Sequence, residues 1–151
     1  MKVSFKHHGF TLLESLLVLM CVTVSLIVPI LGIKSWKEQT EVSLFFNQLE
    51  RKIQQTHQSA IIEVNDSAID QLIVPQRFVF TYYHNGEHRQ DIMEVKAPLK
   101  LRSSEKIEFL GKSGNIKEIR VIKLEDHLNK KVIEYQFQLG SGKVIRRERA
   151  L

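Results

Sequence analysis

The chain has 151 residues, of which 43% are hydrophobic and 26% are charged, and its formal net charge is +5. This length allows one domain, or one domain with an appendage, and the overall composition is that of an ordinary soluble protein. The average conceals an uneven distribution, because 17 of the 24 residues in 10–33 are hydrophobic. A short apolar N-terminal segment is therefore joined to a more polar domain, which disfavours a plain cytosolic globular protein.

The apolar segment is long enough to cross a membrane. It contains a run of 18 uncharged residues, Leu16 to Ile33. As a helix with a rise of about 1.5 Å per residue, residues 10–33 would span about 36 Å, more than a hydrocarbon core of about 30 Å. Lys2 and Lys6 precede the segment, and positive charge stays in the cytoplasm. We therefore expect a single-pass protein of the cell membrane, with a cytoplasmic N-terminus and an external C-terminal domain.

Three kinds of N-terminal segment compete. A secretory signal peptide would need a small-residue exit after the apolar run, and residues 32–36 (GIKSW) provide none. An ordinary single-span anchor stays open. The third kind depends on Glu14, since a carboxylate inside a membrane span usually faces a partner and marks function. If the chain were cut after Gly9, the new α-amino group of Phe10 would lie at the depth of Glu14 in a neighbouring copy.

The run from Gly9 to Leu17, GFTLLESLL, resembles the leader junction of type IV prepilins and type II secretion pseudopilins. The resemblance implies cleavage by a membrane prepilin peptidase between Gly9 and Phe10, followed by N-methylation of Phe10. It implies that Glu14, the fifth residue of the mature chain, guides assembly. The leader 1–9 would take Lys2 and Lys6 with it, so the mature formal charge would fall from +5 to +3.

The helical pattern continues beyond the apolar segment. Hydrophobic and small residues recur at steps of three and four, which predicts a one-sided stripe: Val42, Phe45, Phe46, Leu49, Ile53, Thr56 and Ala60. No glycine or proline interrupts residues 33–64. We expect one helix from about Phe10 to about Ile62, about 80 Å long. Its first half, 10–33, would serve membrane insertion and assembly, and its second half would belong to an external domain, 34–151.

The remainder of the chain is predicted to be β-structure. Asn65, Asp66 and Ser67 end the helix with turn-forming residues, and Asn85-Gly86 between two apolar runs is a strong hairpin signal. The expected fold class is therefore α+β and pilin-like, with a long N-terminal helix packed on a small antiparallel sheet. The segments expected to contain its strands are 77–84, 88–95, 99–101, 106–110, 116–124, 132–139 and 143–147.

No motif in the sequence indicates catalysis. The only cysteine, Cys21, lies in the apolar segment and is most simply a small hydrophobic residue. His84 and His88 flank the predicted hairpin turn, but charged hairpin tips are far commoner than metal sites there. No nucleophile elbow, zinc-protease motif or phosphate-binding loop occurs. We expect no enzymatic activity, no cofactor and no metal site.

The C-terminus is basic, with Lys143, Arg146, Arg147 and Arg149 opposed only by Glu148. Such a tail can attract nucleic acid through its charge, and these four residues are the candidates for contact with DNA. A solvated basic strand at the edge of a sheet is the simpler interpretation, because lysine and arginine there discourage edge-to-edge aggregation.

Within the pilin family, the chain is most similar to the ComGD-type minor pseudopilins of Gram-positive competence systems. The similarity lies in residues 10–19, 44–50 and 135–144. It implies a minor pilin of a competence type IV pilus at the cell surface, required for pilus initiation and uptake of transforming DNA. Its partners would be other competence pilins in a hetero-oligomer, the prepilin peptidase and the membrane, with DNA contacted indirectly. Open alternatives are a pseudopilin of a type II secretion system or another type IV pilus, and a pilin-like module that binds DNA through its basic C-terminus.

Overall fold

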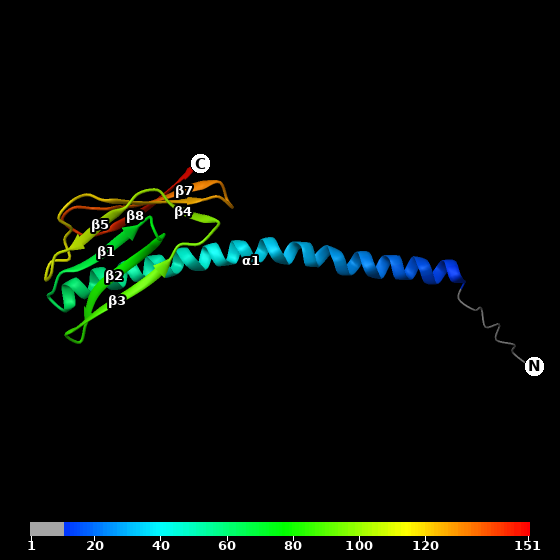
Figure 1. Ribbon diagram of the computed structural model, residues 1–151, viewed down its shortest axis with the longest axis horizontal. Helices are drawn as coiled ribbons and strands as arrows, with labels where there is room; N and C mark the ends of the chain where they lie inside the picture. Colours follow the sequence, from blue (N-terminus) through cyan, green and yellow to red (C-terminus); the bar gives the residue numbers. More distant parts are fainter. Residues whose placement is uncertain (1–10) are drawn as a thin grey trace, which may run out of the picture. The chain divides into compact units, whose positions relative to one another are not determined.

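The computed structural model describes residues 11–151, and for residues 28–32 it describes the backbone alone. The described chain is α+β: one long helix, α1 (Leu12–Ile62), is followed by eight strands. The chain divides into two compact units, Met1–Gln39 and Thr40–Leu151. The second unit contains the last part of α1 and every strand, and Figure 1 shows its strands gathered along that part of the helix.

Local hydrogen bonds explain where α1 begins. The backbone N–H of Glu14 donates to Oγ1 of Thr11 at 3.3 Å, so Thr11 caps the first turn of a helix that starts at Leu12. Threonine followed three residues later by glutamate is the capping-box pattern, which satisfies otherwise unpaired N–H groups. Glu14 also places a carboxylate at the N-terminal end of the helix, where the helix dipole favours negative charge.

The second half of α1 buries the predicted stripe. Leu49 and Ala60 are fully buried, and Phe45 is half-buried at the margin of the core. The helix ends at Ile62, close to the predicted position. Glu63 then uses both carboxylate oxygens to accept the N–H groups of Asn85 and Gly86, at 2.9 and 3.0 Å. The end of α1 is thus fastened to the tip of a hairpin.

Eight antiparallel strands form two four-stranded sheets instead of the single small sheet that was expected. The first, sheet A, has the order β3-β2-β1-β5, and the second, sheet B, has the order β4-β6-β7-β8. The strands are β1 (Ser67–Leu72), β2 (Arg77–His84), β3 (Glu87–Glu94), β4 (Leu99–Leu101), β5 (Glu105–Phe109), β6 (Val121–Asp126), β7 (Lys131–Phe137) and β8 (Val144–Ala150).

The strongest local prediction, the Asn85-Gly86 hairpin, is confirmed. Both residues have positive φ, 55° and 77°, as a two-residue turn between twisted strands requires. The strands on either side pair from Arg77↔Glu94 to His84↔Glu87 without a bulge. Strands β2 and β4 have the predicted bounds, and β3, β5, β7 and β8 shift by one to three residues at their ends.

Strand β1 was not predicted, although it lies in the middle of sheet A between β2 and β5. The reason is that two of its three core-facing residues are polar, Ser67 and Gln71. The Ser67 hydroxyl donates to the carbonyl of Thr56 on α1 at 2.7 Å. The Gln71 amide donates to the carbonyl of Ser103. Hydrogen bonds to the backbone thus replace the hydrophobic alternation that would have revealed the strand.

Two other predicted strands were wrong in part. The predicted strand 116–124 is regular only from Val121, and Ile116 contributes an isolated bridge to Phe109. Leu139, predicted to share the buried face of Phe137, is 54% exposed because β7 ends at Phe137. The chain turns immediately afterwards, where the N–H of Gln138 donates to the carbonyl of Lys143.

One hydrophobic core joins the helix and both sheets in the second unit. Its largest fully buried side chains come from every layer: Leu49 on α1, Phe78, Phe80 and Phe109 in sheet A, and Ile122, Leu124, Tyr135 and Phe137 in sheet B. Because α1 contributes residues to the same core as both sheets, the second half of the helix and the strands stabilise one another.

Candidate functional site

Of the residues expected at the leader junction and in assembly, the structure describes only Glu14. Gly9 and Phe10 lie outside the described residues. Glu14 lies in the first turn of α1, and its side chain is exposed. An exposed carboxylate on an otherwise apolar helical turn is available to a group from another molecule.

In the first half of α1, most of the described side chains from Leu12 to Ile27 are apolar and exposed. Leu12 is 86% exposed and Leu19 is 64% exposed. The hydroxyls within this stretch are satisfied by the helix itself, because Thr23 donates to the carbonyl of Met20 at 2.8 Å and Ser25 donates to that of Cys21 at 2.7 Å. These polar side chains therefore need no partner outside the helix. Among the described residues, no helix is both long enough and apolar enough to span a membrane.

The four basic residues of the C-terminus do not form one group. Lys143 lies in the turn before β8, and the other three lie on β8 itself. Arg146 faces α1, where it forms ion pairs with Glu50 at 3.0 Å and with Glu148 at 2.8 Å. Arg149 lies 3.6 Å from Glu134. Among the described residues, neither Lys143 nor Arg147 has a carboxylate partner.

The register of sheet B places Arg147 on its outer face. Arg147 lies opposite Glu134, and Glu134 lies opposite Lys123 on the next strand. Directly opposed residues of an antiparallel sheet share a face. This outer face gathers five basic residues, Lys100, Arg102, Lys123, Arg147 and Arg149, and two acidic ones, Glu125 and Glu134. Its excess of positive charge extends across the sheet and is not confined to the tail.

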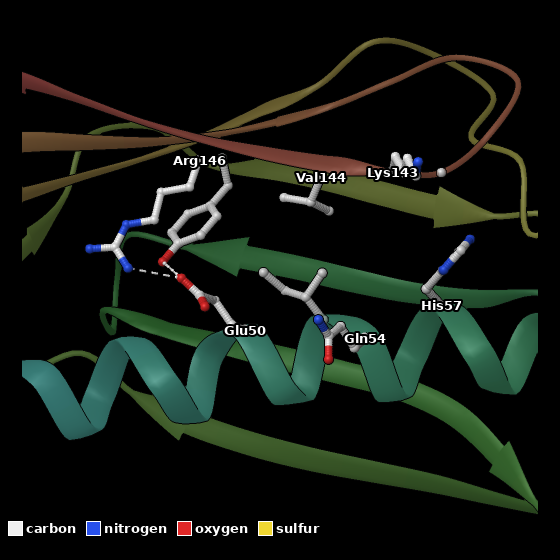
Figure 2. A pocket seen from close by; sticks show the side chains of 9 residues that line it. Glu50, Gln54, His57, Lys143, Val144 and Arg146 are labelled. Atoms are coloured by element: carbon white, nitrogen blue, oxygen red, sulfur yellow. Dashed lines mark hydrogen bonds and ion pairs between the residues drawn. The ribbon is translucent and has the colours of Figure 1, made fainter.

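A groove of about 420 Å³ lies between α1 and β8 (Figure 2). Glu50, Gln54 and His57 line it from the helix, and Lys143, Val144 and Arg146 line it from the other side. Ile53, Tyr135 and Gly142 complete its lining. The helical residues are spaced at i, i+4 and i+7, the spacing that puts side chains on one face of a helix.

A three-residue cluster closes one end of the groove, as the dashed lines in Figure 2 show. Glu50 Oε1 accepts hydrogen bonds from the Tyr135 hydroxyl at 2.9 Å and from Arg146 Nη1 at 3.0 Å. Burial, together with the neighbouring Glu50 carboxylate, raises the pKa of Tyr135 above its usual range. Tyr135 therefore stays protonated, and its hydroxyl donates a hydrogen bond to Glu50. The Arg146 guanidinium also lies 5.3 Å from the centre of the Phe46 ring, within cation–π range.

His57 lies at the other end of the groove, where the backbone packs tightly around it. Its Nε2 atom is buried without a hydrogen-bond partner in the described structure. A Cβ atom added at Gly142 would lie 2.4 Å from Nε2, and one added at Gly114 would lie 2.7 Å from it. Both glycines also have positive φ. These glycines therefore allow the turns after β5 and β7 to close over the imidazole ring.

The carboxylate that lines the groove is already engaged in hydrogen bonds. Glu50 is engaged as an acceptor, and its two donors are a protonated tyrosine and an arginine. Among the described residues, no group of three or more histidine, cysteine, aspartate or glutamate side chains could hold a metal ion. His88 lies against the ring of Tyr83, with 5.4 Å between the ring centres. The lining of the groove combines hydrophobic side chains, such as Ile53 and Val144, with the cationic Lys143 and the ion pair of Arg146 with Glu50.

Sequence reasoning did not find this groove. Glu50, Gln54 and His57 lie beside the predicted apolar stripe, and their spacing of four and three was visible in the sequence. What the sequence lacked was the partner, since β8 and the turn before it are brought to α1 only by the fold of sheet B.

Comparisons of the chain with protein-family profiles, with curated proteins and with solved structures found no match.

Proposed function

We propose that the chain is a minor pilin, or pseudopilin, of a competence type IV pilus, required for pilus assembly and for uptake of transforming DNA. The observation that carries the proposal is the sequence junction of Gly9, Phe10 and Glu14, placed directly before 18 uncharged residues. The chain would be processed between Gly9 and Phe10, anchored by the apolar segment, and assembled with other pilins. Its role would be structural and not enzymatic.

The structure supports this proposal in two ways. The helix begins at Leu12, so that Glu14 lies in its first turn with an exposed side chain. The helix then continues without a break to Ile62, where its second half joins the core of an α+β domain. A helix that is exposed and apolar in its first half and buried on one side in its second half suits a subunit that assembles through the first half.

The pairing of Glu14 with a neighbouring α-amino group gives the proposal its test. Glu14→Val removes the carboxylate and keeps the segment apolar, so membrane insertion should persist while incorporation into the pilus complex and transformation are lost. Thr23→Val is the matched control, because Thr23 lies in the same half of α1 and its hydroxyl is satisfied within the helix. Loss of both processes by the control, or unchanged transformation in Glu14→Val, would contradict the pairing.

The same test separates the related alternatives. An unrelated single-span anchor would be indifferent to Glu14 and would keep its leader. A pseudopilin of a type II secretion system would share the Glu14 requirement, but its deletion would impair export of secreted proteins and leave transformation intact.

Direct DNA binding is a second candidate, favoured by the five basic residues on the outer face of sheet B. Each phosphate contact contributes to a linear fall of log K with log salt concentration. If four of these residues contact phosphates, the slope for duplex DNA should be about −3 to −4. The change Arg147→Gln should reduce the slope by about 1, because Arg147 has no carboxylate partner in the described structure. A flat salt response would exclude this candidate.

A further inference from the structure

Each sheet of the second unit has one long free edge. Strand β3 is the outermost strand of sheet A, and β8 is the outermost strand of sheet B. Their ranges are Glu87–Glu94 and Val144–Ala150. The opposite edges are shorter, since β5 has five residues and β4 has three. Long unpaired edges are templates for another strand unless something covers them.

On β8, the hydrogen bonds at both ends of the β7–β8 hairpin define which backbone groups are free. The N–H of Gln138 donates to Lys143, and the N–H of Leu151 donates to Lys130. Since hydrogen-bonded and non-hydrogen-bonded pairs alternate along an antiparallel ladder, the backbone N–H and C=O groups of residues 145, 147 and 149 point towards β7. The N–H and C=O groups of the even-numbered residues, 144 to 150, therefore point away from sheet B.

On β3, the same reasoning identifies a complementary set. The N–H of Val95 donates to Gln76, so residues 93, 91, 89 and 87 use their backbone groups to pair with β2. The backbone groups of His88, Gln90, Ile92 and Glu94 then point away from sheet A. On each edge, four alternate residues therefore have backbone N–H and C=O groups that point away from the sheet. No described segment forms a backbone hydrogen bond with either set.

Charge decides which edges can meet. Strand β3 contains three acidic residues and one arginine, a net charge of −2. Strand β8 contains three arginines and one glutamate, a net charge of +2. Pairing two copies of β3, or two copies of β8, would bring like charges together, which is destabilising across strands. Between these two long edges, only β3 of one copy with β8 of another joins opposite net charges, and Arg147 on β8 has no carboxylate partner within the described residues of its own copy.

The groove beside β8 provides room for the incoming strand. Val144 and Arg146 belong both to the free edge and to the wall of the groove, whose floor includes Ile53. On β3, Ile92 is 57% exposed at the centre of the free edge. An antiparallel β3 strand laid along β8 would therefore bring the exposed Ile92 and Glu94 to the face of the groove, and Glu87 to the opposite face, which carries Arg147.

We infer that β8 of one copy of this chain pairs with β3 of a second copy, so that the two sheets continue into one another. The contact is heterologous, because it uses different surfaces on the two copies. Each added copy leaves one free β3 and one free β8, so the association propagates beyond a dimer. The inference goes beyond the proposed function, since it concerns the external domain and requires neither leader cleavage nor Glu14.

Complementary edge-blocking variants test the inference in the full chain, purified in detergent under reducing conditions. Ile92→Pro removes an N–H that points away from β2, and Glu148→Pro removes one that points away from β7, so each proline blocks one edge and leaves its own hairpin intact. Each variant alone should fail to associate through this contact. Their mixture should form a 1:1 dimer and no larger species, whereas the wild type should form larger species. Sedimentation velocity distinguishes these outcomes.

A variant that carries both prolines measures any association that does not use the two long edges, such as association through α1. If Ile92→Pro or Glu148→Pro alone associates as the wild type does, or if their mixture behaves like the double variant, the inference is overturned. Self-association of Glu148→Pro alone would indicate pairing of β3 with β3. Far-ultraviolet circular dichroism reports whether each variant retains its strands.

A charge-reversal series keeps the inference testable if a proline prevents folding. Arg147→Glu should weaken association roughly fivefold or more, because an attractive cross-strand contact becomes repulsive. Glu87→Lys should do the same, because Glu87 and Arg147 would lie on the same face of the joined sheets, and the combination of both changes should restore association. Lys100→Glu alters the net charge equally at the opposite edge of sheet B, so it should have little effect. Equal effects of Arg147→Glu and Lys100→Glu, or no restoration in the combined variant, would overturn the inference.

Discussion

Replacing Ser59 by alanine should destabilise the external domain through two backbone groups of one strand residue. Ser59 is buried on α1, and its hydroxyl donates to the carbonyl of Tyr83 at 2.7 Å while accepting the N–H of Tyr83 at 3.0 Å. The ladder between β1 and β2 begins at Ala68↔Thr81, so Tyr83 lies beyond the end of β1. Ser59 therefore takes the place of the missing strand partner.

The magnitude follows from the number of groups left without a partner. A typical hydrogen bond contributes about 1 kcal/mol, and a buried group left unsatisfied costs about 1–3 kcal/mol. Two such groups at Tyr83 give about 2–6 kcal/mol. Alanine gains roughly 0.5 kcal/mol of helix propensity over serine, so the net loss in the free energy of unfolding should be about 2 kcal/mol or more.

Urea unfolding of the full chain in detergent measures this loss, with Ser43→Ala as the control. Ser43 is an exposed residue of the same helix, so its replacement should change the free energy of unfolding by no more than about 0.5 kcal/mol. Hydrogen exchange of the Tyr83 amide supplies a local measurement, and Ser59→Ala should accelerate it. The reasoning is refuted if both alanine variants are equally stable and Tyr83 exchange is unchanged.

Three further predictions concern packing and charge. Gly142→Ala should destabilise the domain more than Gly140→Ala, because both glycines have positive φ but, of the two, only Gly142 would place a Cβ against His57. The melting temperatures of the two variants should differ by several degrees. Equal decreases in melting temperature would show that the contact with His57 does not matter. Leu49→Ala should reduce the free energy of unfolding by about 2–5 kcal/mol. Leu44→Ala, on the exposed side of the helix, should change it by less than about 0.5 kcal/mol. Comparable decreases in the free energy of unfolding would mean that the stripe does not face the core. Lys106 and Lys117 lower the pKa of Glu108 from 4.5 to about 2, so its contribution to stability is complete above about pH 4.5 and is lost as the pH falls towards 2. Glu108→Gln should therefore flatten the curve of unfolding free energy against pH in this range. An unchanged slope would show that Glu108 does not contribute.

The parts of the fold that were predictable are those in which local signals and tertiary contacts agree. The stripe from Val42 to Ala60 has helical spacing and lies in the core, and Asn85-Gly86 has the residue types that a tight hairpin demands. Both signals depend on residues close together in the sequence. The one-sheet prediction went further than the pattern allowed, because strand periodicity does not determine which strands are neighbours.

The parts that were not predictable depend on distant partners. Strand β1 faces the core with Ser67 and Gln71, whose hydrogen-bond acceptors lie 11 and 32 residues away in the sequence. The groove likewise requires Arg146 to reach Glu50, 96 residues away. A basic tail was visible in the sequence, but its division between a helix-facing Arg146 and an outward Arg147 follows only from the register of β7 and β8.

The measurement that tests the central claim most directly is the mass of the N-terminal peptide of the chain, isolated from membranes of cells that contain a prepilin peptidase. Processing as a pilin predicts a chain that starts at Phe10 with an N-methylated α-amino group, and a Gly9→Val variant that keeps its leader. A wild-type chain that starts at Met1 in the same cells would contradict the claim, and with it the partner assigned to Glu14.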